Sequence, residues 1–126
     1  MSLAHLTLAS RAVEATAAFL EQTLGYRRAA HPDNIPFEAV WLDIGKGQQL
    51  HLVYIEGFEV SPFEREFGRH VAVFHPLAAF AELKAALAAR GAELMEPLRT
   101  TSFERFFFRE PINGYLFEVI DAAREQ

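Results

Sequence analysis

The sequence predicts an α+β fold of two tandem βαβββ modules whose sheets curl into an incomplete barrel or cup around a metal site. Short segments of alternating apolar residues, typical of strands, outnumber the two segments in which apolar residues recur at helical spacing. The order strand, helix, three strands occurs twice. His5 stands 46 residues before His51, and His70 stands 48 residues before Glu118, so the landmarks repeat as well.

The whole chain, residues 1–126, is predicted to be one domain. Its 126 residues are 51% hydrophobic and include 12 Phe, enough to build a substantial core. We expect a first module over about 1–56, a linker over 57–68 and a second module over about 69–126. Phe58, Phe63 and Phe67 lie in this linker. Three phenylalanines in a connector predict either core filling or packing against the other module or a second copy, and we expect a homodimer.

The first module begins with a strand over residues 3–8. A helix is expected from an N-cap at Ser10 to Leu24, closed by Gly25. Its apolar stripe comprises Val13, Ala17, Leu20 and Leu24. Three further strands complete the module, over residues 26–30, 37–44 and 48–54, and the last two are joined by a turn rich in glycine.

The second module repeats this order, starting with a strand over residues 69–74. Its helix is expected to begin at Pro76 and to end at Gly91. Its apolar stripe comprises Leu77, Phe80, Leu83 and Leu87, and its later strands are expected over residues 92–95, 103–108 and 115–120.

Four residues of metal-binding type interrupt these apolar strands. They are His5, His51, His70 and Glu118. A buried carboxylate is costly unless it is paired, so four such residues in four strands predict a shared site. Imidazoles with one carboxylate suit a divalent transition metal, namely Fe, Mn, Co, Ni or Zn, and no organic cofactor is expected.

The pattern leaves two ligand sets open. If all four residues bind an octahedral ion, two positions remain for a bidentate oxygen substrate. If His5, His70 and Glu118 form a facial triad, three positions remain and His51 becomes a nearby base. Thr7 and Gln49 share the faces of the candidate ligands and are expected to orient a bound oxygen of the substrate.

Composition excludes several classes of function. The net charge is −5 with no basic run, which argues against nucleic acid as a partner. There is no Cys, so disulfides and thiolate chemistry are excluded. Neither a membrane span nor a signal-peptide pattern is found, and we expect a soluble cytoplasmic protein that acts on a small molecule.

Three motifs resemble those of the glyoxalase/bleomycin-resistance/extradiol-dioxygenase group, the vicinal oxygen chelate superfamily, over essentially the whole chain. They are Ala4–Leu8 with the helix end Thr23–Tyr26, then Arg69–Val73, and last Arg109–Glu118. The resemblance implies a glyoxalase-like enzyme whose metal chelates vicinal oxygens for isomerase or lyase chemistry, with Glu118 as a ligand that can also act as base.

Differences between this chain and members of the superfamily narrow the range of expected reactions. Glyoxalase I has glutamate where this chain has His51, so glutathione-dependent chemistry is not expected. Fosfomycin-resistance enzymes share the His-x-Thr of His5 and Thr7, but their lysine-bearing loop is not recognisable in residues 98–104. The rival readings are an Fe(II) extradiol-type dioxygenase and a non-catalytic protein that binds a drug or metabolite.

Overall fold

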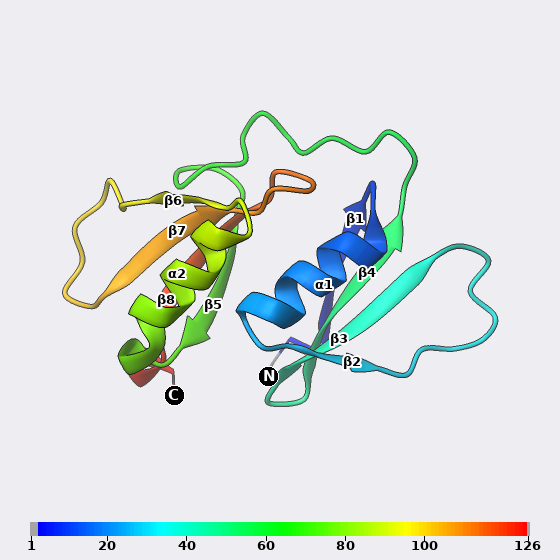
Figure 1. Cartoon of the computed structure of the whole chain (residues 1–126), viewed down its shortest axis with the longest axis horizontal. Coiled ribbons are helices and arrows are strands. Elements are labelled where there is room, and N and C mark those ends of the chain that lie inside the picture. Colours follow the sequence, from blue (N-terminus) through cyan, green and yellow to red (C-terminus); the bar gives the residue numbers. More distant parts are fainter. Residues whose placement is uncertain (1–2, 126) are drawn as a thin grey trace. The chain divides into compact units, whose positions relative to one another are not determined.

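The computed structural model describes residues 3–125 and divides the chain into two compact units between Glu59 and Val60. Each unit runs strand, helix, three strands, as the labels in Figure 1 show. The predicted α+β class with two tandem βαβββ modules is therefore confirmed. The division falls inside the segment 57–68 that was expected to be the linker.

The first unit is a four-stranded mixed sheet covered on one face by a helix. Strand β1 pairs in parallel with β4, and the other pairs are antiparallel, in the order β1-β4-β3-β2. The elements are β1 (His5–Ser10), α1 (Val13–Thr23), β2 (Arg27–Ala29), β3 (Ala39–Gly45) and β4 (Gln48–Tyr54).

Helix α1 forms because its apolar residues return to one side every three or four positions. Val13, Ala17 and Leu20 are buried as predicted. The expected cap at Ser10 is wrong, because Ala12 occupies the N-cap position and Ser10 ends β1. The Ser10 hydroxyl still accepts a hydrogen bond from the Ala12 N–H at 3.0 Å, so it closes the turn between strand and helix.

The second unit repeats the arrangement with the strand order β5-β8-β7-β6, again with only the first pair parallel. Its elements are β5 (Val71–His75), the short 3₁₀ turn η1 (Leu77–Ala79), α2 (Phe80–Ala89), β6 (Glu93–Met95), β7 (Arg105–Arg109), β8 (Leu116–Asp121) and η2 (Ala122–Arg124). Strand bounds differ from the predicted ones by at most two residues.

Two details of the second unit depart from expectation. Phe80, Leu83 and Leu87 are buried as predicted, but Leu77 is 45% exposed, because the chain after Pro76 begins with the 3₁₀ turn. A 3₁₀ turn places side chains at a different angle from an α-helix, so the stripe starts one turn later. His70 stands just before β5 rather than within it.

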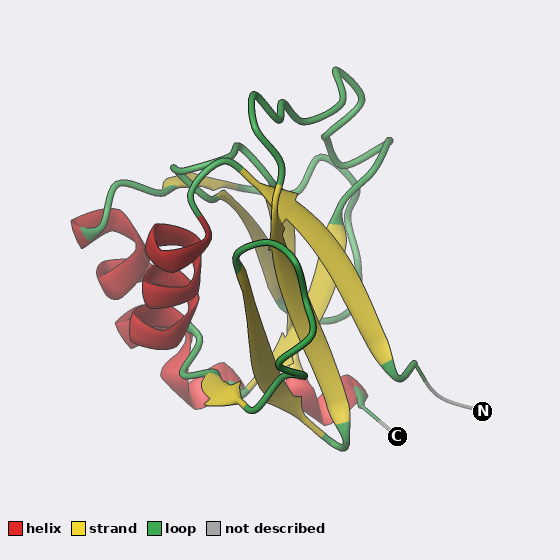
Figure 2. Ribbon diagram, turned by 90° about the vertical axis from the view of Figure 1, so that its right-hand side faces the viewer, coloured by secondary structure: helices red, strands yellow, loops and turns green. Residues whose placement is uncertain are grey.

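In each unit the helix forms one layer and the sheet forms the other (Figure 2). The register places Thr7, Trp41 and His51 side by side on adjacent strands. In the other sheet, Phe107 and Glu118 are paired in the same way. Since alternate residues point to opposite faces, the candidate site residues lie on the faces that the helices do not cover.

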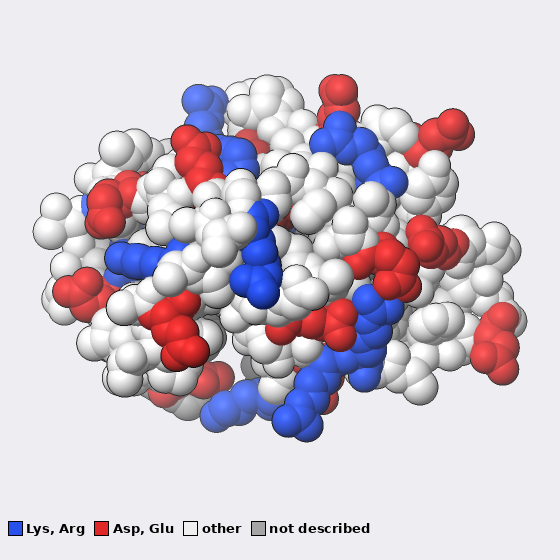
Figure 3. All heavy atoms as spheres, viewed as in Figure 1, with Lys and Arg blue, Asp and Glu red and all other residues white. Residues whose placement is uncertain are grey.

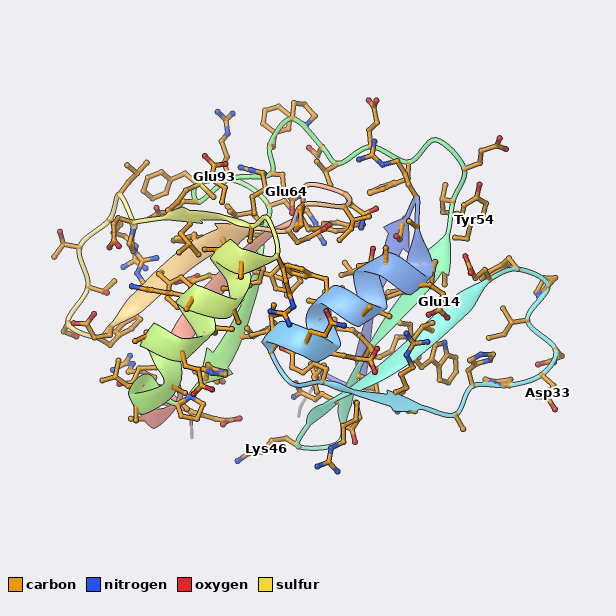
Figure 4. All side chains as sticks on the ribbon, viewed as in Figure 1. Glu14, Asp33, Lys46, Tyr54, Glu64 and Glu93 are labelled. Atoms are coloured by element: carbon orange, nitrogen blue, oxygen red, sulfur yellow. The ribbon has the colours of Figure 1, made fainter. Side chains whose placement is uncertain are left out.

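Basic and acidic side chains are interspersed on the face of the described residues that Figure 3 shows. Within residues 3–125, no helix has the length and apolar character needed to cross a membrane.

Candidate functional site

Three aromatic rings stack on the open face of the first sheet. The His51 ring lies between Trp41, with ring centroids 3.7 Å apart and planes 4° apart, and His5, with values of 4.0 Å and 14°. Trp41 and His51 are direct cross-strand partners on β3 and β4. The stack fixes the plane of His51 on both sides.

A hydrogen bond fixes the orientation of the His51 ring within this plane. Its Nε2 lies 2.8 Å from Oε1 of Gln49. Since a carbonyl oxygen can only accept, Nε2 carries the proton and Nδ1 keeps the lone pair. Burial lowers the pKa of His51, and the neighbouring His5 lowers it further. His51 is only 7% exposed, so a neutral imidazole is the stable form at pH 7.

The stacked geometry bears on whether His5 and His51 can share an ion. An imidazole nitrogen directs its lone pair in the plane of its ring, so a bound metal lies close to that plane. The two ring planes are nearly parallel and one ring lies above the other. An ion in the plane of one ring is then out of the plane of the other. As placed, only one of these two histidines can bind a given ion.

The second unit holds a pair of ligand type, with Glu118 buried and His70 partly buried. Glu118 on β8 is 7% exposed, and its Oε1 lies 3.1 Å from Nε2 of His70. The His70 ring also meets Phe107 edge to face, with centroids 5.4 Å apart. Glu118 is therefore buried as predicted, and His70 is the candidate ligand that it contacts.

Arg105 on β7 is a residue of the candidate site that was not among the predicted site residues. This arginine is only 6% exposed, and its guanidinium donates to Oε2 of Glu118 at 2.9 Å. Alternation along Arg105–Arg109 could have revealed it, because Arg105 shares a face with Phe107, the cross-strand partner of Glu118.

Glu66 receives the other side of the Arg105 guanidinium, at 3.2 Å. Burial alone would raise the pKa of Glu66, but the N–H donors of Leu98 and Arg99 and the charge of Arg105 outweigh it, so its pKa is lowered. Both carboxylates are therefore acceptors for one guanidinium. One guanidinium and two carboxylates give the group of Arg105, Glu66 and Glu118 a formal charge of −1.

These observations test whether the residues fit a metal ion. Metal–nitrogen and metal–oxygen bonds of about 2.1 Å place neighbouring ligands of an octahedron about 3 Å apart. The 3.1 Å between His70 Nε2 and Glu118 Oε1 matches that edge, and the negative charge of the group suits a cation. Within residues 3–125, ligand-type side chains do not form groups of three or more. The second-unit pair fits an ion that takes further ligands from elsewhere.

A cavity of about 230 Å³ in the second unit is lined by neighbours of this pair, although not by His70 or Glu118 themselves. Phe107, which contacts His70, and Glu66, which binds Arg105, both line it. The rest of its lining combines the apolar residues Met95, Leu98 and Leu116 with the charged residues Arg65, Glu96 and Arg109. A dry cavity of about 150 Å³ accommodates benzene, so this one has room for a small organic group.

The fold consists of two βαβββ units with ligand-type residues on their open sheet faces. Sequence comparison assigns a chain with this fold to a family. Residues 2–119 match the family described as Glyoxalase/Bleomycin resistance protein/Dioxygenase superfamily. The chain belongs to this family. No curated protein matches it in sequence.

Solved structures show the same fold at low sequence identity. A glyoxalase family protein from Bacillus anthracis superposes with a TM-score of 0.75 at 21% identity, covering 96% of this chain and 94% of that one. A mutant of the fosfomycin resistance protein FosX from Listeria monocytogenes gives 0.75 at 21%, covering 95% and 91%. That FosX structure holds Mn(II) and 1S,2S-dihydroxypropylphosphonic acid.

FosX from Mesorhizobium loti is a third similar structure, with a TM-score of 0.71 at 19% identity, covering 94% of this chain and 90% of that one. At these identities the likeness concerns the fold.

Proposed function

We propose that the protein is a metal-dependent, glyoxalase-like enzyme that chelates vicinal oxygens of a small substrate for isomerase or lyase chemistry. The observation that carries the proposal is the pair of partly buried His70 and buried Glu118, 3.1 Å apart, next to a group with a formal charge of −1. The family assignment and the Mn(II) in similar FosX structures support a divalent transition metal.

We assign the ligands as His5, His70 and Glu118. His5 is the exposed ring of the first-unit stack, whereas His51 is held by Gln49 and Trp41. Because the stacked rings cannot both bind one ion, the facial triad is favoured over the set of four.

The bound ion supplies Lewis acidity toward a substrate oxygen. The protein groups around it position the substrate and hold the protons. Neutral His51 offers its Nδ1 lone pair as a base, because Gln49 fixes the proton on Nε2. Thr7, exposed next to His51 on β1, can donate a hydrogen bond to a substrate oxygen.

An Fe(II) extradiol-type dioxygenase is the second candidate, and the ring stack is the observation that favours it. Three protein ligands leave three positions on an octahedral ion, enough for a bidentate diol and O₂. Four protein ligands would leave only two. The same site could therefore serve oxygen chemistry if iron is the resident metal.

Metal binding by histidine variants tests the ligand set. We expect about one Mn(II) per site in the wild type by calorimetry, and loss of binding in His70→Ala and His5→Ala. His51→Phe keeps the stack and should keep the metal. His31→Ala is the matched control, because His31 is exposed in a loop, bonds to the Pro32 carbonyl and meets the outer ring of the stack, Trp41, only at a centroid distance of 6.2 Å. Loss of metal in His51→Phe with retention in His5→Ala would refute the assignment.

Turnover separates the candidate reactions. An isomerase or lyase should work with Mn(II), Co(II), Ni(II) or Zn(II) on α-hydroxycarbonyl or thioester substrates, because it needs only a Lewis acid. Oxygen uptake by the Fe(II) protein with a panel of catechols would favour the dioxygenase. Tight binding of these compounds with no turnover under any metal would favour a binding protein and count against both enzymes.

A further inference from the structure

We infer that Arg105 is a positioning residue for the metal ligand Glu118: it holds Oε2 of the carboxylate so that Oε1, beside His70, is the oxygen presented to the ion. This inference rests on the proposed function. The contact that carries it is the 2.9 Å hydrogen bond from the Arg105 guanidinium to Glu118 Oε2.

The Arg105 guanidinium is itself buried and bound by several partners. Its side chain is 2% exposed. Besides Glu118, it donates to Glu66 Oε2 at 3.2 Å, to the Arg99 carbonyl at 2.6 Å and to Thr101 Oγ1 at 3.4 Å. A planar donor fork held on three sides by other partners has one orientation. The guanidinium therefore fixes the position of its fourth partner, the Glu118 carboxylate.

Glu66 holds the side of the Arg105 guanidinium that does not contact Glu118. Its two oxygens accept hydrogen bonds from the backbone N–H groups of Leu98 and Arg99, at 2.7 and 3.0 Å. The segment between β6 and β7 thus anchors Glu66, and Glu66 anchors the guanidinium. The chain of contacts reaches from the backbone to the candidate ligand.

The two carboxylate oxygens of Glu118 therefore have different partners. Oε2 is occupied by a charge-assisted hydrogen bond, and Oε1 faces His70 Nε2 at 3.1 Å. A carboxylate so held binds an ion through one oxygen, leaving more positions for a substrate. Groups that orient a ligand in this way typically contribute 10- to 100-fold to metal affinity.

The test measures Mn(II) affinity by calorimetry for Arg105→Lys and Arg105→Met. Lysine keeps the charge but lacks the planar fork, and methionine removes both. We expect Kd to rise by about 10- to 100-fold in Arg105→Met and by less in Arg105→Lys. Arg28→Lys is the matched control: it alters an arginine fork on Glu14 and Glu21, remote in sequence from the ligands, and Mn(II) affinity should not change.

The melting temperature of each metal-free variant is measured alongside. A purely structural role would lower the melting temperature while the folded protein keeps wild-type Mn(II) affinity, and this result would overturn the inference. If neither Arg105 variant folds, Glu66→Gln loosens the guanidinium from its far side, and unchanged affinity there would overturn it equally. Absence of Mn(II) binding by the wild type would instead refute the metal assignment itself.

Discussion

Removal of the Glu118 carboxylate should destabilise the metal-free protein by an amount that depends on what replaces it. The side chain is 9% exposed and accepts from Arg105 and from His70. Glu118→Ala leaves the buried Arg105 with Glu66 as its one carboxylate partner. Breaking a buried ion pair costs about 3–5 kcal/mol, and because Glu66 remains, we expect about 3 kcal/mol in the free energy of unfolding.

Glu118→Gln keeps the shape and an accepting oxygen but loses the charge. The loss should be about 1 kcal/mol, the difference between a charge-assisted and a neutral hydrogen bond. Both variants should lose metal binding, so the comparison separates stability from ligation. Urea denaturation in the presence of a chelator, followed by far-UV circular dichroism, gives the two free energies.

The fluorescence of Trp41, the single tryptophan, reports the first unit separately. Glu93→Ala is the control: this glutamate lies on β6 of the same sheet, is 70% exposed in its side chain and reaches Arg109 only at 4.0 Å. Its effect should be within about 0.5 kcal/mol. Equal losses in Glu118→Ala and Glu118→Gln, or none in either, would refute the reasoning that the buried charge pair stabilises the unit.

Three further predictions follow from single contacts. Burial lowers the pKa of His75, and Glu82 partly offsets this, so Glu82→Gln should lower the pKa further in an NMR titration. The unfolded chain then takes up this proton first as pH falls through about 6.5, so stability should decrease there, less so in His75→Phe. Gly68→Ala should cost about 1–3 kcal/mol in thermal unfolding, because a Cβ there overlaps the Phe63 carbonyl oxygen. Phe63 and Phe67 are 60% and 67% exposed, so we expect a dimer in sedimentation that Phe67→Ser weakens; a wild-type monomer would contradict this.

Alternation and spacing were sufficient to predict the elements. Strand β4 has the predicted bounds, and the stripe of α1 is buried because apolar residues at helical spacing can lie against a sheet in only one way. Ser10 shows the limit of local signals. Its hydroxyl accepts from a backbone N–H as a cap would, but strand pairing with β4 extends β1 through it and the helix starts later.

Alternation also placed His51 and Glu118 on the open faces of their sheets, since the side of a strand on which a residue points follows from its position alone. What alternation cannot give is the partner across the sheet, because strand order and register depend on pairings between distant segments. The stack of His5, His51 and Trp41 needs β1 and β3 on either side of β4. The role of Arg105 likewise appears only when β7 lies beside β8. In the sequence an arginine is expected at the surface, and only the tertiary structure brings the buried Glu118 carboxylate within hydrogen-bond distance of it.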